Sequence, residues 1–137
     1  MSTSPAGLAP ADRPPGALVA YRVLVNIFGV LVLVQAALAG QFLNGQGGLR
    51  QTHQLLAVAV FPVLSVLLVV LAALSLRRAG SGPLVLSAVL LVLAVAQTGL
   101  GFVGRSSLGA ASIHIPLGVA LFGLSIYALG YVKRLGR

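Results

Sequence analysis

Two kinds of side chain are missing or almost missing from this sequence. It has no cysteine, and its 137 residues include a single acidic one, Asp12. Without cysteine the chain forms no disulfide, thiolate metal site or iron–sulfur cluster, and it has no thiol nucleophile. Without a carboxylate after Asp12 it lacks the paired carboxylates of general acid–base enzymes and the acidic residues of a membrane proton relay.

Charged residues of either sign are scarce, at 7%, whereas 58% of the residues are hydrophobic. A soluble domain of this length cannot bury so much apolar surface, so the composition is typical of a chain surrounded by lipid. The net charge of +8 would suggest nucleic acid in a soluble protein. The basic residues interrupt apolar runs instead of clustering, so we expect no nucleic-acid partner.

Four long apolar runs follow a proline-rich leader, residues 1–16, which we expect to be a disordered tail. The runs predict helices at about 17–42, 54–76, 83–103 and 113–132. About 20 residues at 1.5 Å each cross a hydrocarbon core of ~30 Å, and only helices satisfy their backbone groups there. The sequence therefore predicts an all-α membrane domain over residues 17–137, a four-helix up-down bundle.

The first run has an alternative interpretation as a cleavable signal peptide. Arg22 precedes the largely apolar residues 23–34, and Ala37, Leu38 and Ala39 form a possible cleavage site. The apolar character continues through Leu43, however, which favours a helix that is retained.

Basic residues near the run ends predict the orientation. Seven lie on one side: Arg13, Arg22, Arg77, Arg78, Lys133, Arg134 and Arg137. The other side has only Arg50 and Arg105. The excess predicts a multi-pass protein of the cell membrane with both termini in the cytoplasm.

Several residues carry expectations about local structure. Thr52 and Ser112 are candidate N-caps, Pro116 is expected in the first turn of the fourth helix, and Pro62 should bend the second helix and free the carbonyl of Val58. Glycines that would permit close helix approach are Gly29, Gly40, Gly99, Gly101, Gly104, Gly118, Gly123 and Gly130.

The two halves of the chain share a polar pattern. Gln35 matches Gln97 at an offset of 62, and His53 matches His114 at an offset of 61. Each half is a helix with a glutamine near its end, a loop, and a histidine at the start of the next helix. The pattern predicts two repeated helical hairpins.

These are the only two histidines, and they begin helices that lie diagonally in an up-down bundle. Two imidazoles facing each other across the bundle axis suit a six-coordinate haem iron, so we expect haem b with His53 and His114 as metal ligands. Ala57 and Gly118, one turn later, are small and leave room for a porphyrin edge. Arg50 and Arg105 are candidate partners of the haem propionates.

Each of these residues also has a simpler interpretation. A histidine at a membrane boundary is often an interfacial residue, and an arginine at a loop end reaches water. Gln35 and Gln97 are favoured as polar contacts between helices, with contact to haem or to a histidine nitrogen as the alternative.

The two histidines, with their glutamines, resemble one half of haem A synthase, the cytochrome oxidase assembly family. That family has two four-helix bundles, each with histidines on its second and fourth helices, and the similarity spans about residues 20–132. Small single-bundle membrane proteins are similar as well. The resemblance implies a haem-binding fold with His53 and His114 as ligands.

One departure concerns catalysis. A glutamate precedes the second-helix histidine in the catalytic half of the family, whereas residues 50–53 read Arg, Gln, Thr, His. The loop cysteines of many members are also missing. We therefore expect electron transfer or haem handling rather than an enzyme, with a homodimer or larger membrane complex as a possible assembly.

Two alternatives belong to other functional classes. One is a cofactor-free accessory or assembly subunit whose glycine-rich faces only pack. The other is a small four-helix transporter, which the missing intramembrane acid disfavours.

Overall fold

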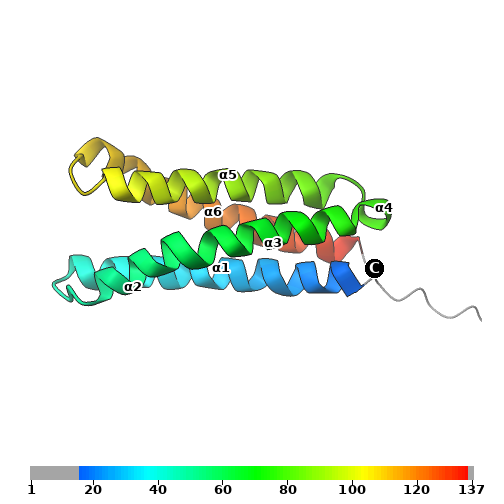
Figure 1. Ribbon diagram of the computed structural model, residues 1–137, viewed down its shortest axis with the longest axis horizontal. Coiled ribbons are helices and arrows are strands. Elements are labelled where there is room, and N and C mark those ends of the chain that lie inside the picture. Colours follow the sequence, from blue (N-terminus) through cyan, green and yellow to red (C-terminus); the bar gives the residue numbers. More distant parts are fainter. Residues whose placement is uncertain (1–15, 136–137) are drawn as a thin grey trace, which may run out of the picture.

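The computed structural model describes residues 16–135 as four long antiparallel helical segments, shown in Figure 1. The first is α1 (Gly16–Leu43), and the second consists of α2 (Leu49–Leu55), the π-helical η1 (Leu56–Val60) and α3 (Phe61–Leu74). A short α4 (Leu76–Ala79) leads to α5 (Gly82–Val103) and α6 (Leu108–Arg134). The described residues contain no β-strand, so the predicted all-α four-helix architecture is confirmed. The predicted tail lies outside these residues except for Gly16, which begins α1.

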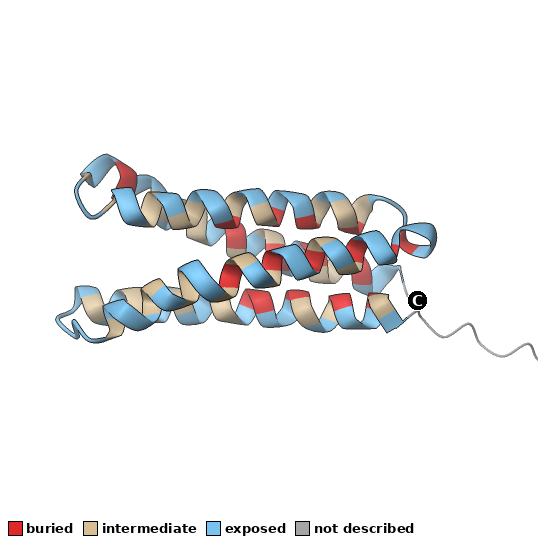
Figure 2. Cartoon of the chain, viewed as in Figure 1, coloured by how far each residue is buried: buried red, intermediate tan, exposed pale blue. Residues whose placement is uncertain are grey.

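All four segments are long and apolar enough to cross a membrane. They have 28, 26, 22 and 27 residues, with mean hydropathies of 2.3, 3.0, 2.2 and 1.8 over their most apolar stretches. Large apolar side chains such as Val23, Val63, Val92 and Val119 are exposed on the outer faces, as Figure 2 illustrates. A surface of this kind is stable only against lipid, so the chain is a multi-pass membrane protein.

The helices form a ring in which each has two main neighbours. Helix α1 packs against α3 and α6, and α5 packs against the same two helices. Helices α3 and α6 are therefore diagonal, as predicted. Their buried faces have the same spacing: Phe61, Ser65, Leu68 and Ala72 on α3, and Leu121, Ser125, Ala128 and Val132 on α6.

The two ends of the bundle are packed differently. We call the end with the start of α1, the end of α6 and α4 the terminal end, and the end with turns 44–48 and 104–107 the loop end. Figure 2 shows most buried positions in the middle of the bundle and toward its terminal end. At the loop end the hairpin of α1 and α2 separates from the hairpin of α5 and α6 (Figure 1).

The helices at the loop end begin earlier than expected. Helix α2 begins at Leu49 and α6 at Leu108, five residues before the sequence-based positions. The N-cap of α6 is Ser107, whose hydroxyl accepts from the Ala110 N–H at 3.4 Å, and that of α2 is Gly48 without a side-chain bond. The cap assignments to Thr52 and Ser112 were wrong, because polar residues continue a helix into the membrane interface.

Two further expectations about helix interiors need correction. Pro116 lies in the ninth position of α6 rather than in its first turn. Only some of the glycines lie at close helix contacts: a Cβ on Gly29 would lie 2.8 Å from Ser125 Oγ, and one on Gly104 would lie 3.3 Å from the Ala111 backbone nitrogen of α6. The positions with open space are Gly40, Gly99, Gly123 and Gly130.

The π-helical turn η1 changes the effect of Pro62. The Phe61 N–H bonds to the Leu56 carbonyl, five residues earlier. With the same spacing of five residues, an N–H at position 62 would donate to the Ala57 carbonyl. Pro62 has no N–H, so the carbonyl that it frees is that of Ala57 and not that of Val58. The single hydroxyl proton of Thr98 on α5 has two carbonyl oxygens within reach, that of Ala94 at 2.9 Å and this Ala57 oxygen at 3.2 Å. The Ala57 carbonyl thus receives a shared hydrogen bond from the other hairpin in place of the lost helical one.

Candidate functional site

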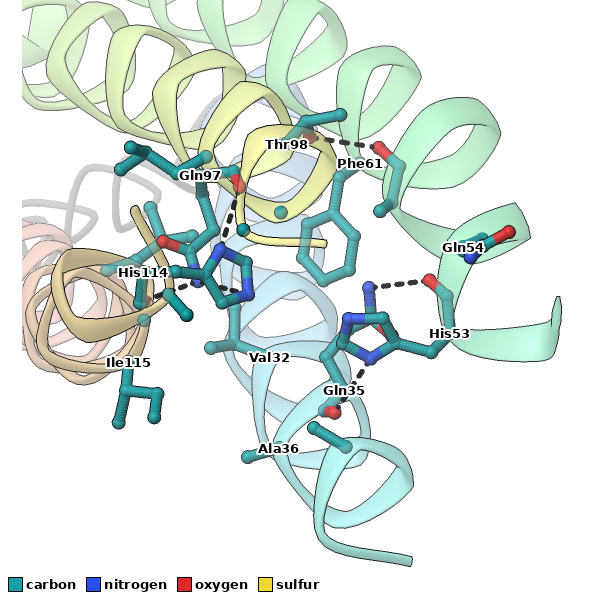
Figure 3. A pocket seen from close by; sticks show the side chains of 18 of the residues that line it. Val32, Gln35, Ala36, His53, Gln54, Phe61, Gln97, Thr98, His114 and Ile115 are labelled. Atoms are coloured by element: carbon teal, nitrogen blue, oxygen red, sulfur yellow. Dashed lines mark hydrogen bonds between the residues drawn. The ribbon is translucent and has the colours of Figure 1, made fainter. Parts of the chain in front are cut away.

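The separation of the hairpins at the loop end leaves a cavity of about 560 Å³. Its volume is in the range of pockets for small molecules and cofactors. Both histidines and both glutamines of the shared polar pattern line it. Figure 3 shows the His53 and His114 rings entering the cavity from different hairpins, with Phe61 between them in this view.

In the first hairpin, Gln35 of α1 and His53 of α2 hold each other through two hydrogen bonds. The Gln35 Nε2 amide donates to the His53 backbone carbonyl at 3.0 Å. The His53 Nδ1 lies 3.1 Å from the Gln35 backbone carbonyl. Phe42 adds an edge-on contact to the imidazole, with ring centroids 5.3 Å apart. The ring is therefore fixed from two sides.

The second hairpin repeats this arrangement with different sequence neighbours. The Gln97 Nε2 amide of α5 donates to the His114 backbone carbonyl at 2.9 Å, and His114 Nδ1 lies 3.0 Å from the Gln97 backbone carbonyl. A Cβ on Gly101 would lie 3.1 Å from His114 Cε1, so the imidazole packs against that glycine. We call each of these two reciprocal pairs a Gln–His clip.

The clips determine the protonation of both neutral imidazoles. A backbone carbonyl only accepts hydrogen bonds, so Nδ1 must carry the proton in each ring. Nε2 then keeps its lone pair. A metal-binding histidine in proteins commonly has this arrangement, with one nitrogen bonded to a carbonyl and the other free for the metal.

The clips leave one acceptor without a partner in each glutamine. Gln35 Oε1 and Gln97 Oε1 are buried and have no hydrogen-bond partner among residues 16–135. The amide orientation is fixed because the NH₂ group must face the histidine carbonyl. Each glutamine that lines the cavity thus keeps one unpaired acceptor inside the protein.

Glycine at position 118 has a different surrounding from the one expected. A Cβ there would lie 3.0 Å from Gln97 Nε2, so the glutamine amide fills the space expected for a porphyrin edge. Gly118 and Ala57 both line the cavity. Gly118 therefore also permits the second Gln–His clip to form.

The two arginines lie at the rim of the cavity. Arg50 is in the first turn of α2, Arg105 is in the turn before α6, and both are exposed and line the cavity. The Arg105 guanidinium lies over the Phe102 ring, 4.7 Å from its centroid. The rim is positively charged, and the only acidic side chain of the sequence, Asp12, is outside the described residues.

The donor set is too small for a bare metal ion held by the usual ligands. Among the described residues, no group of three or more His, Cys, Asp or Glu side chains comes together. Two imidazoles suit a metal that brings its other ligands with it. A porphyrin supplies four nitrogens and leaves two axial positions.

Sequence reasoning missed two residues of the site. Thr98, which bonds the Ala57 carbonyl, was detectable as a second polar residue beside Gln97 in an apolar run. Phe61, which packs edge-on against Phe28 with centroids 5.1 Å apart, gave no signal among the other apolar residues.

The fold and the site together define a multi-pass helical membrane protein with a largely apolar cavity between two hairpins, lined also by two histidines and two glutamines. Comparisons of the chain with models of protein families, with curated proteins and with solved structures found no match.

Proposed function

We propose that the chain is a haem-b-binding integral membrane protein that transfers electrons or handles haem, with His53 and His114 as the axial ligands. The observation that carries the proposal is the pair of Gln–His clips. Both clips fix the proton on Nδ1. Within the described part of the chain, the Nε2 lone pair is left without a partner in His53, and in His114 it meets only a long contact from Gln97 Nε2 at 3.4 Å. When bound, haem supplies a one-electron redox centre, while the chain supplies ligation and an apolar surrounding.

The remaining lining supports a flat apolar cofactor with an anionic edge. Most lining side chains are apolar, among them Val32, Phe61, Leu121 and Phe122. Among residues 16–135, the charged side chains that line the cavity are Arg50 and Arg105, which are suited to carboxylate groups such as haem propionates. Two axial imidazoles leave no open iron position, which favours electron transfer over oxygen activation.

We further propose that the two hairpins are a repeat, and that the π turn keeps their histidines equivalent. His53 lies eight residues before the buried Phe61, and His114 lies seven before the buried Leu121. The second segment thus has one extra residue between histidine and core. A π turn absorbs one residue without rotating the helix face, and η1 lies in this interval.

The orientation is part of the same proposal. Among the described residues, Arg22, Arg77, Arg78, Lys133 and Arg134 lie at the terminal end, and Arg50 and Arg105 at the loop end. This asymmetry favours cytoplasmic termini in the cell membrane and a haem site near the outer surface. A homodimer would place two such sites in one assembly.

The experiment is a reduced-minus-oxidised absorption spectrum of the protein purified in detergent from a haem-sufficient host. We expect a sharp α-band that is lost in both His53→Ala and His114→Ala. Thr52→Ala and Ser112→Ala are matched controls, because both residues are exposed neighbours of the histidines and do not line the cavity. They should keep the band.

The alternative is a cofactor-free accessory or assembly subunit. It is favoured by the Gln97 Nε2 contact to His114 Nε2 at 3.4 Å, because this contact uses the histidine nitrogen inside the protein. The bond is long, and hydrogen bonds weaken steeply near this distance. A colourless protein obtained at full yield would support this alternative over haem.

A further inference from the structure

A second polar site lies at the terminal end, far from the cavity. Arg22 of α1 is six residues from the start of the helix, about 9 Å along its axis. Its side chain is half-buried, and one terminal nitrogen donates to the Val132 carbonyl of α6 at 3.0 Å. Its Nε is buried and has no partner among residues 16–135. The guanidinium is thus held in place by one hydrogen bond, while its Nε donor stays unpaired inside the protein.

This donor belongs to a group that keeps its charge. An arginine side chain stays protonated in proteins, and a charge within a membrane-spanning helix is costly unless it is paired. Val132 lies in the last turn of α6, where carbonyls lack helical partners and carry partial negative charge. The Val132 carbonyl offers the guanidinium only a partial negative charge. No acidic side chain that could neutralise it occurs between residues 16 and 135.

The surroundings of Arg22 add positive charge instead of neutralising it. The exposed Lys133 and Arg134 follow Val132 directly, and α4 carries the exposed Arg77 and Arg78. Figure 1 shows α4, the start of α1 and the end of α6 at the same end of the bundle. Tyr127 and Tyr131 of α6 have ring centroids 6.4 Å apart near this end. Tyrosines are typical of the membrane interface, where lipid headgroups lie.

We propose that Arg22 binds the phosphate of an anionic phospholipid in the leaflet at the terminal end. A phosphate oxygen accepts from a guanidinium through charge-assisted hydrogen bonds, and a long arginine side chain reaches from the helix to headgroup level. The neighbouring cations favour a lipid with net negative charge. The proposal is independent of the haem cavity.

The test is native mass spectrometry of the full chain with phosphatidylglycerol or phosphatidylcholine added to the detergent. Arg22→Gln should weaken phosphatidylglycerol binding about tenfold, because a hydrogen bond to a charged group is lost. Arg77→Gln is the matched control, since it removes the same charge from an exposed position at the same end. It should retain most of the binding. Arg22→Lys, which keeps the charge and loses the fork of donors, should bind at an intermediate level and keeps the test usable if Arg22→Gln fails to fold.

Three outcomes overturn the proposal. Equal binding by Arg22→Gln and Arg77→Gln would mean that only net charge attracts the lipid. If inorganic phosphate displaced phosphatidylglycerol as effectively as phosphatidylglycerol itself does, the site would bind a free anion. Equal binding of phosphatidylglycerol and phosphatidylcholine by the unmodified protein would mean that the site does not recognise the net negative charge of the lipid.

Discussion

The identity of donor and acceptor atoms determines what each histidine of the site does. In both Gln–His clips the imidazole meets a backbone carbonyl, and the glutamine side chain meets the histidine carbonyl. The acceptor of each Nδ1 proton is a backbone carbonyl. Replacing the glutamine side chain therefore leaves that acceptor in place. The glutamines are thus positioning residues that tie the histidine backbone to the neighbouring helix.

Single glycines give a direct measure of how closely α1 and α6 pack. We expect Gly29→Ala to lower the free energy of unfolding by about 1–3 kcal/mol, as overpacked positions do. The new Cβ would meet Ser125 Oγ at 2.8 Å, and that hydroxyl is bonded to the Phe122 carbonyl at 2.7 Å. Thermal denaturation in detergent measures the change.

Gly40→Ala is the control on the same helix, because a Cβ there has nothing within 4 Å. It should be neutral or slightly stabilising, since alanine favours helix. If both variants unfold at the same temperature, α1 and α6 do not pack as closely as described.

At this scale the sequence singled out the glutamines and histidines that the structure places at one cavity, but not the atoms that they bond. Gln35, Gln97, His53 and His114 were detectable because polar residues are rare in apolar runs. Their partners are backbone carbonyls, and backbone atoms carry no sequence signal. The contact of Gln97 with Gly118 depends on how closely α5 approaches α6, which composition does not reveal.

Among the elements, the second crossing segment is the irregular one. It passes from α2 through the π-helical η1 into α3, while α6 is a continuous helix. Pro62 and the bond from Thr98 to the Ala57 carbonyl lie at this transition. The interval from His53 to Phe61 is one residue longer than that from His114 to Leu121, and the π turn η1 lies within it, close to the cavity.

Deletion of one residue tests this role of η1. Removing Ala59 should convert η1 into regular α-helix and keep His53 at the cavity, so the haem α-band should remain. Pro62 would then stand four residues after Ala57, so Thr98 would still find a free carbonyl there. The spectrum of the purified variant is the measurement.

The matched deletion is Ala120 in α6, which is also exposed and lies six residues after His114, as Ala59 does after His53. Helix α6 has no π turn, so this deletion should rotate His114 by about 100° relative to the core and abolish the band. If both deletions behave alike, η1 does not compensate for the extra residue.

The sequence predicted the number and approximate place of the helices but not their ends or the π turn. Apolar runs mark the part of a helix that lies in hydrocarbon. Polar residues such as Arg50 and Thr52 continue the helix beyond it. A π turn depends on the register of neighbouring helices, which only the packed bundle reveals.

For the whole molecule, the arrangement of charge predicts how the bundle sits in the membrane. The sequence has no cysteine, so single cysteines can be introduced without removing native ones. Gln46 lies in the turn between α1 and α2, and Ser81 lies between α4 and α5; both are exposed. They therefore report on opposite sides of the membrane.

We expect a membrane-impermeant maleimide to label Gln46→Cys in intact cells, and Ser81→Cys only after permeabilisation. Labelling of Ser81→Cys in intact cells would reverse the orientation and place the cavity near the cytoplasm.

The central claim is that both imidazoles bind the same iron through Nε2. Electron paramagnetic resonance of the ferric protein, with haem counted per chain, tests it most directly. We predict one haem per chain and a low-spin signal that becomes high-spin in His114→Gly and returns when imidazole is added. A high-spin signal in the unmodified protein, or a low-spin signal that survives His114→Gly without imidazole, would contradict the account.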